Sequence, residues 1–259
     1  GVDEHVWRHT RFGDRYVTVI IDLTPTRRKT GPARLLDMVE GRSKAVFKQW
    51  LAERPKAWRD RIEVVAMDGF TGFKTAASEE LPDAVPVMDP FHVVRLAGDG
   101  LDRCRQRVQQ ATLGHRGRAG DPLYGIRRAL HTGAAFLTEK QKARLEAVFA
   151  VDEHVEVEAT WGIYQRIVAA YREPDKTRGK LMVQAVTESV ASGVPAALTE
   201  IRSFGRTLKQ RAVDILAFFE RPAPATDPHR HSTAALSTSE AQPSASATSR
   251  TTSPDHYSN

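Results

Sequence analysis

The chain has 259 residues, a length that suits one domain or about one and a half. Its formal net charge of +6 favours polyanionic partners, and its single cysteine, Cys104, excludes an internal disulfide framework and a thiolate zinc site, so we expect a reducing, cytoplasmic setting. No apolar run approaches the roughly 20 residues of a membrane span and no signal-peptide pattern opens the chain, which argues against a membrane partner.

The N-terminal part of the chain carries short runs of β-branched and apolar residues, which predict strands. The first is the brief start "GVD", and the most continuous are "YVTVIIDL" and "IEVVAMD". Between these two, apolar residues recur at helical spacing from Val46 to Leu51, and Ser43 is a suitable N-cap, so the stretch "SKAVFKQWLAERPKAW" predicts a helix. This order of elements predicts a mixed α/β layer. The strands are expected at residues 1–3, 16–23, 33–41, 62–68 and 84–89.

Beyond Asp89 the pattern becomes helical. The Gly-rich, basic residues 115–121 predict a loop, and "TEKQ" from Thr138 has the spelling of a capping box. Three more helices are predicted after it, the last one continuous over residues 195–220. We therefore expect an α/β core over residues 1–97, a helical region over 98–221 and a disordered tail over 222–259, where the apolar pattern stops.

Three aspartates stand where predicted strands end. Asp3 follows "GV", Asp68 closes "EVVAMD" and Asp89 closes "VPVMD", so each could project a carboxylate from the rim of one sheet. Hard cations such as Mg²⁺ take oxygen ligands, and strand-end carboxylates can hold two of them for phosphodiester cleavage. The alternative is that these aspartates begin turns by accepting hydrogen bonds from the next backbone N–H groups.

The segment after Asp89 is rich in arginine and contains one histidine near an acid. His92 could be a metal ligand or proton carrier, or a hydrogen-bonded structural group at a helix start. The arginines outnumber the nearby acids and could form a phosphate-contacting face, although a solvated helix surface has the same charge pattern. The candidate DNA-binding residues are Arg95, Arg103, Arg105, Arg107, Arg116, Arg118, Arg127 and Arg128.

Several separated motifs occur together in a fixed order. They are "GVDEHVWRHTRFGDRYVTVIIDLTPTR", "VEGRS", "VVAMDGFTGFKTAASEELPDAVPVMDPFHVVRL" and "LDRCRQRVQQ". In this order they resemble the catalytic region of bacterial insertion-sequence transposases of the L-three family, from Gly1 to about Pro222. The family's N-terminal zinc-binding and helix-turn-helix regions have no counterpart, and the chain does not begin with Met, so we expect an N-terminal region to be missing.

The resemblance implies an RNase H-like core with a DDE triad, two Mg²⁺ ions, and strand cleavage and transfer on double-stranded DNA at the ends of the element. Asp3, on the first strand, takes the place of the first acid, and Asp68, on the fourth strand, takes the place of the second. Asp22 is a weaker contender for the first role because it also ends a strand. Asp89 and His92 match the family's "D.FH" element, to which we assign a structural or site-supporting role.

The third acid of the triad has no counterpart in the chain. In the family it is a Glu in a segment that follows "F..RP", but here Pro222 is followed by the unpatterned tail. When the tail residues are written as degenerate codons and regrouped by one base, "STSEAQPSASATSRTTSP" permits the family's "NLRGSALGFRNLTNYI". We therefore infer a frameshift close to Pro222. The codon for the missing Glu would begin with the third base of His229, which cannot be G, so even the restored frame would lack this Glu.

The leading hypothesis from the sequence is a transposase remnant that keeps two metal-binding aspartates and is inactive without its third acid. A less favoured enzyme reading lets Glu200 or Glu220 replace the missing acid. The non-enzymatic alternative is a DNA-binding or multimerising fragment, acting as a homo-oligomer or on an intact transposase of the same group and interfering with it. A third alternative is an unselected product that hardly accumulates.

Overall fold

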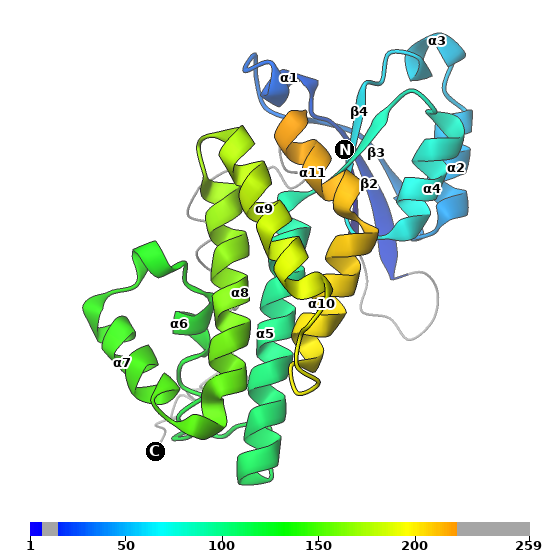
Figure 1. Ribbon diagram of the computed structural model, residues 1–259. Coiled ribbons are helices and arrows are strands. Elements are labelled where there is room, and N and C mark those ends of the chain that lie inside the picture. The colour runs from blue at the N-terminus through cyan, green and yellow to red at the C-terminus, as the bar shows by residue number, and fades with distance from the viewer. Residues whose placement is uncertain (7–14, 222–259) are drawn as a thin grey trace, which may run out of the picture.

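The fold joins an α/β layer to a bundle of helices, as Figure 1 shows for the computed structural model. The structure describes residues 1–6 and 15–221. The tail that we expect to be disordered and frameshifted, residues 222–259, lies outside the described residues.

The sheet has five strands in the order β3-β2-β1-β4-β5. The pairs β1–β2 and β2–β3 are antiparallel, whereas β4 runs parallel to β1 and to β5. All five predicted strands are present, and β1 continues past the expected "GVD" to Val6. The strands are β1 Val2–Val6, β2 Tyr16–Asp22, β3 Arg34–Glu40, β4 Val64–Met67 and β5 Val85–Met88.

Helices cover both faces of the sheet. On one face, Phe47 and Trp50 of α2 (Lys44–Ala52) and Phe73 of α4 (Thr71–Glu80) pack against strand residues such as Met67, and all of these side chains are buried. On the other face, Ala217 of α11 (Ala212–Glu220) packs against residues of β2, β4 and β5. Because side chains alternate along a strand, Met67 of β4 packs on one face of the sheet and the preceding residue, Ala66, packs on the other.

The first eight helices follow the chain from the sheet into the helical region. They are α1 Thr24–Arg27, α2 Lys44–Ala52, α3 Lys56–Arg59, α4 Thr71–Glu80, α5 Pro90–Leu113, α6 Arg127–His131, α7 Glu139–Phe149 and α8 Val155–Arg172. The predicted N-cap is confirmed, because the Ser43 hydroxyl accepts a hydrogen bond from the Val46 N–H. The predicted helix through Trp58 is interrupted, because Pro55 lacks an N–H and disfavours helical backbone before it, and α3 begins after it.

Three helices complete the described chain, and short 3₁₀ turns lie before α7 and α8. The helices are α9 Lys176–Ala191, α10 Thr199–Gln210 and α11 Ala212–Glu220, and the turns are η1 Ala134–Phe136 and η2 Asp152–His154. The capping box at Thr138 is confirmed, with reciprocal hydrogen bonds between Thr138 and Gln141. The single helix predicted over residues 195–220 is wrong: Arg211 lies between α10 and α11, so that α11 turns back onto β5. No helix in the described ranges is long and apolar enough to cross a membrane.

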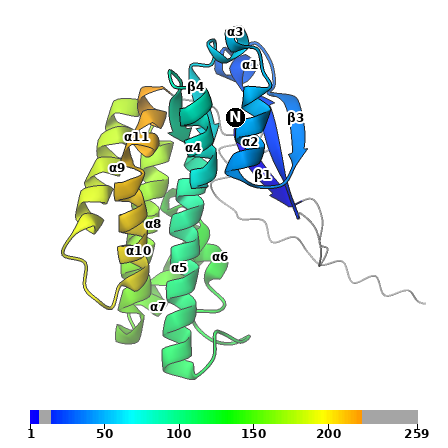
Figure 2. The same ribbon diagram turned by 90° about the vertical axis from the view of Figure 1, so that its right-hand side faces the viewer.

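Helix α5 connects the two parts of the molecule. It starts at the sheet beside β5 and runs down through the bundle, where it packs against α8 and α10 (Figure 2). The expected boundary between residues 97 and 98 lies inside this continuous helix. One apolar cluster extends from Met88 on the sheet through Leu101 to the late helices, so the sheet and the bundle share a core.

Candidate metal centre

The parallel pairing of β1 with β4 brings Asp3 and Asp68 side by side. Val2 lies opposite Met67 in this pairing. The residues that follow are Asp3 in β1 and Asp68 directly after β4, and neighbouring strands are about 4.8 Å apart. Asp3 and Asp68 are therefore far apart in the sequence but lie side by side at one rim of the sheet.

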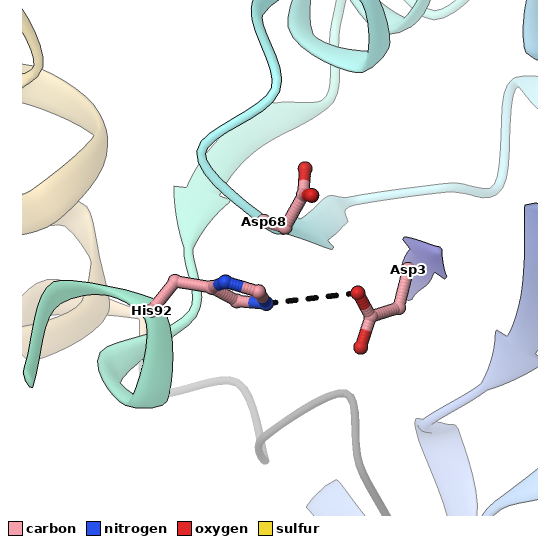
Figure 3. A group of neighbouring side chains, drawn as sticks. All are labelled: Asp3, Asp68 and His92. Carbon is pink, nitrogen blue, oxygen red and sulfur yellow. Dashed lines mark ion pairs between the residues drawn. The ribbon is translucent and has the colours of Figure 1, made fainter. Parts of the chain in front are cut away.

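Helix α5 brings His92 to the same rim. Met88 at the end of β5 lies opposite Met67, so Asp89 follows β5 where Asp68 follows β4. The buried Asp89 carboxylate caps α5 by accepting a hydrogen bond from the Phe91 N–H, at 2.8 Å. His92 lies in the first turn of this helix, and its Nε2 is 3.6 Å from Oδ1 of Asp3. Figure 3 shows the His92 ring turned toward the Asp3 carboxylate.

Asp3, Asp68 and His92 form a group of potential metal ligands. One ligand atom from each side chain lies within 4.8 Å of the others. Asp68 is 3% exposed, and the Asp3 and His92 side chains are partly exposed, so the group opens to solvent on one side. Within residues 1–6 and 15–221, these three residues are the only set of His, Cys, Asp or Glu side chains that converges in this way.

Burial and the charge of Asp3 act against ionisation of Asp68. Burial raises the pKa of Asp68 above its ordinary value, although the Phe70 N–H, which donates to its carboxylate at 2.8 Å, opposes this effect. Burial alone would lower the pKa of His92, but the contact with Asp3 and the charges of Asp89 and Asp68 outweigh it and raise that pKa. The group therefore holds excess negative charge that His92 offsets when protonated, and a cation would offset it more fully.

The donor set fits a divalent cation with oxygen ligands. Mg²⁺ binds oxygen at about 2.0–2.1 Å, so two ligands on opposite sides of one ion are roughly 4.2 Å apart. Ligand atoms of Asp3 and Asp68 lie within 4.8 Å of each other, so both carboxylates can reach a single ion placed between them. Mg²⁺ and Mn²⁺ both suit carboxylate oxygen, whereas imidazole nitrogen suits metals such as Zn²⁺ or Fe²⁺, so His92 is the less natural of the three Mg²⁺ ligands.

Residues 1–226 match a protein family described as transposase, the ISL3 family. The chain belongs to this family. The match confirms the resemblance carried by the motifs, and it gives the transposase a role in DNA transposition and implies that it binds DNA. Searches among curated proteins and among solved structures find no match.

Two charged residues beside the candidate metal centre have no assigned role in the sequence analysis. Glu4 forms an ion pair with Arg42, whose guanidinium lies over the rings of Tyr16 and Phe70. Burial and the charge of Asp68 raise the pKa of Glu4, and Arg42 opposes them. The motif "VEGRS" contains Arg42, so the signal for it was present, although its spacing to Asp68 gives no hint of proximity.

The other acids considered from the sequence lie elsewhere in the transposase. Asp22 ends β2, which runs antiparallel to β1, and its carboxylate accepts hydrogen bonds from Arg34 and from the Thr24 N–H. Glu200 is held by Arg107 through two hydrogen bonds of 2.9 and 2.8 Å, and Glu220 pairs with Lys180. None of these three acids joins the Asp3–Asp68–His92 group.

The candidate DNA-binding arginines fall into two sets. Arg105 is buried and donates to Gln109 and to the Leu123 carbonyl, and Arg107 is held by Glu156 and Glu200. The guanidinium groups of Arg105 and Arg107 are thus engaged within the protein. The exposed members are Arg95, Arg103, Arg116, Arg118, Arg127 and Arg128. Among these, Arg127 also pairs with Asp102.

Proposed function

We propose that this chain is a DDE-type, RNase H-like catalytic domain of a transposase, with Asp3 as its first acid and Asp68 as its second. The observation that carries the proposal is the convergence of Asp3, Asp68 and His92 on one rim of a mixed sheet. The resemblance calls for the first acid on the first strand and the second on the fourth, and the positions of Asp3 on β1 and of Asp68 after β4 support this assignment.

Each residue of the group has a role in this proposal. Asp3 and Asp68 bind a divalent cation through carboxylate oxygens. Asp89 caps α5 and thereby fixes the first turn, which carries His92. His92 contacts Asp3 and orients its carboxylate. A bound Mg²⁺ would supply Lewis-acid stabilisation of charge on phosphodiester oxygens.

We infer that the third acid is missing and that strand cleavage is therefore lost. No glutamate within the described ranges joins the group. The family match ends at residue 226, close to Pro222, where the shifted reading frame begins in our interpretation. Loss of one ligand of a two-metal site leaves the attacking and leaving oxygens incompletely held. The protein would then retain metal and DNA binding without completing the reaction.

The outer face of α5 provides a path for DNA away from the metal centre. Arg95 follows His92 by three residues and Arg103 follows it by eleven, close to one and three turns of about 3.6 residues, so all three lie on one face. Both arginines are exposed. We propose that they contact phosphates of DNA whose scissile strand reaches the metal centre. The exposed basic residues of the loop after α5 and of α6 would extend this surface.

Two assays on DNA that carries the ends of the element test the proposal. Binding is measured over a range of salt concentrations, and nicking is measured with Mg²⁺ or Mn²⁺, for the wild type, Asp68→Ala and the control Asp22→Ala. We expect salt-sensitive binding by all three proteins and cleavage by none.

Each other outcome overturns a defined part of the proposal. Cleavage that disappears in Asp68→Ala but not in Asp22→Ala would show that another acid completes the centre, so the inferred loss of activity would be wrong. Absence of binding at low salt would overturn the DNA-binding role. If the expected binding without cleavage also blocks an intact transposase of the same group, the role as a catalytic remnant gives way to that of an interfering fragment.

A further inference from the structure

Helix α11 carries a fully buried aspartate that is paired with two cations. Asp214 has no exposed surface. Its Oδ2 accepts a hydrogen bond from Nε of Arg211 at 2.7 Å, and its Oδ1 lies 2.9 Å from Nζ of Lys74. Burial of a carboxylate is costly unless it is paired, so these two contacts are what keep Asp214 in place.

Both cations connect α11 to the segment that follows Asp68. Nη1 of Arg211 donates to the carbonyl oxygen of Gly69, the residue next to Asp68, at 3.1 Å. Lys74 belongs to α4, which begins at Thr71 directly after the same segment. The contacts of Asp214 therefore hold the two ends of residues 69–74 against a helix more than a hundred residues later in the chain.

The conformation of residues 69–74 determines the orientation of the Asp68 carboxylate. The Asp68 carboxylate accepts a hydrogen bond from the Phe70 N–H, within the turn that contains Gly69. A shift of the Gly69 carbonyl would rotate the peptide that leads to Phe70 and disturb this hydrogen bond. Groups that orient metal ligands contribute strongly to metal affinity even when they do not touch the metal.

We propose that Asp214, with Arg211 and Lys74, is a positioning residue for the metal centre and holds Asp68 in its metal-binding orientation. This inference rests on the proposed function, because it assigns a role to Asp68 in metal binding. In this proposal α11, the last described helix, contributes to metal binding by Asp3, Asp68 and His92. The alternative is a buried ion pair that only stabilises the fold.

The test compares metal affinity and local hydrogen exchange in variants of the full chain. Asp214→Asn removes the buried charge. Arg211→Lys keeps a cation beside Asp214, but one ammonium does not reproduce the guanidinium fork that reaches both Asp214 and Gly69, so this variant is expected to fold. Asp102→Asn is the control, because Asp102 is also paired with several cations but lies about 15 Å further along α5 than His92.

We expect the Mn²⁺ affinity to fall about tenfold in Asp214→Asn and Arg211→Lys and to stay at the wild-type value in Asp102→Asn. Without metal, backbone amides of residues 68–73 should exchange faster in the first two variants only. Unchanged affinity and unchanged exchange in Asp214→Asn and Arg211→Lys would overturn the inference, as would equal losses of affinity in all three variants. If Asp68→Asn binds Mn²⁺ as tightly as the wild type does, the proposed function fails instead. In that case, hydrogen exchange of the backbone amides of residues 68–73 alone decides whether α11 holds this segment.

Discussion

Replacement of Asp68 by Asn should stabilise the metal-free protein and abolish its response to metal. The Oδ1 of Asn can still accept the hydrogen bond from the Phe70 N–H, so the change mainly removes charge. Ligand atoms of Asp3 and Asp68 lie within 4.8 Å of each other, where two like charges repel by at least about 3.5 kcal/mol at an effective dielectric constant of about 20. Protonated His92 and solvent around Asp3 offset part of this repulsion, so we expect a net gain of about 1 kcal/mol.

Metal binding reverses this order of stability. A cation that binds only the folded wild type at about ten times its dissociation constant adds about 1.4 kcal/mol of stability. For a domain of this size, 1 kcal/mol corresponds to about 2–4 °C in Tm. Thermal unfolding should therefore show a wild-type Tm that rises by about 3–6 °C with Mg²⁺ or Mn²⁺, and an Asp68→Asn Tm that is higher without metal and does not respond.

The control for this experiment is Asp22→Asn. Hydrogen bonds from the Thr24 N–H and Arg34 outweigh the effect of burial and lower the pKa of Asp22 to about 2. Loss of this charge should lower the metal-free Tm and leave the metal-induced rise unchanged. A lower metal-free Tm of Asp68→Asn would contradict the expected repulsion between Asp3 and Asp68. A metal response equal to that of the wild type would show that Asp68 does not bind the metal.

Three further predictions concern stability and DNA binding. Burial opposes ionisation of Asp102, but His131 and Arg127 hold its pKa below the ordinary 3.8, so its stabilising effect is present above that value and is lost as the pH falls below it. Asp102→Asn should therefore cost about 3 kcal/mol in urea unfolding at pH 7, and a gap to the wild type that does not shrink at acidic pH would contradict this. Gly205→Ala places a Cβ against the Val190 carbonyl oxygen and should destabilise the chain by about 1–3 kcal/mol, whereas Gly162→Ala, which meets nothing, should not destabilise it; the prediction fails if the two variants unfold alike. In DNA-binding titrations, the double substitution Arg95→Gln and Arg103→Gln should reduce the salt slope by about 2 relative to the control Arg28→Gln, which changes an exposed arginine at the end of α1, and an equal slope in both proteins would remove α5 from the DNA surface.

The sequence predicts the positions of the strands better than it predicts where the sheet passes into the helical bundle and where the last helices end. β2 and β4 are recognisable because continuous apolar and β-branched runs suit buried strands. The boundary expected near residue 97 falls inside α5, because an amphipathic helix that leaves a sheet and enters a bundle keeps one periodicity throughout. The break at Arg211 has no signal in the local apolar pattern, and one of the groups that Arg211 contacts there, the Gly69 carbonyl, is far away in sequence.

The candidate site shows the same limit. Strand-end aspartates are visible in the sequence, but their proximity depends on the parallel pairing of β1 with β4, which local pattern does not specify. The arginine content of α5 suggested a phosphate-contacting face, yet Arg105 turns inward to Gln109 and the Leu123 carbonyl. A charge count cannot separate such a buried guanidinium from the exposed Arg95 and Arg103 on the same helix.

The metal centre is tested directly by the stoichiometry of Mn²⁺ binding, obtained from the electron paramagnetic resonance signal of free Mn²⁺. We expect at least one bound ion per chain, with binding lost in Asp3→Asn and in Asp68→Asn and retained in Asp22→Asn. Binding that survives in Asp3→Asn and is lost in Asp22→Asn would contradict it, because the metal centre would then lie at the end of β2 and not at the rim shared by β1 and β4.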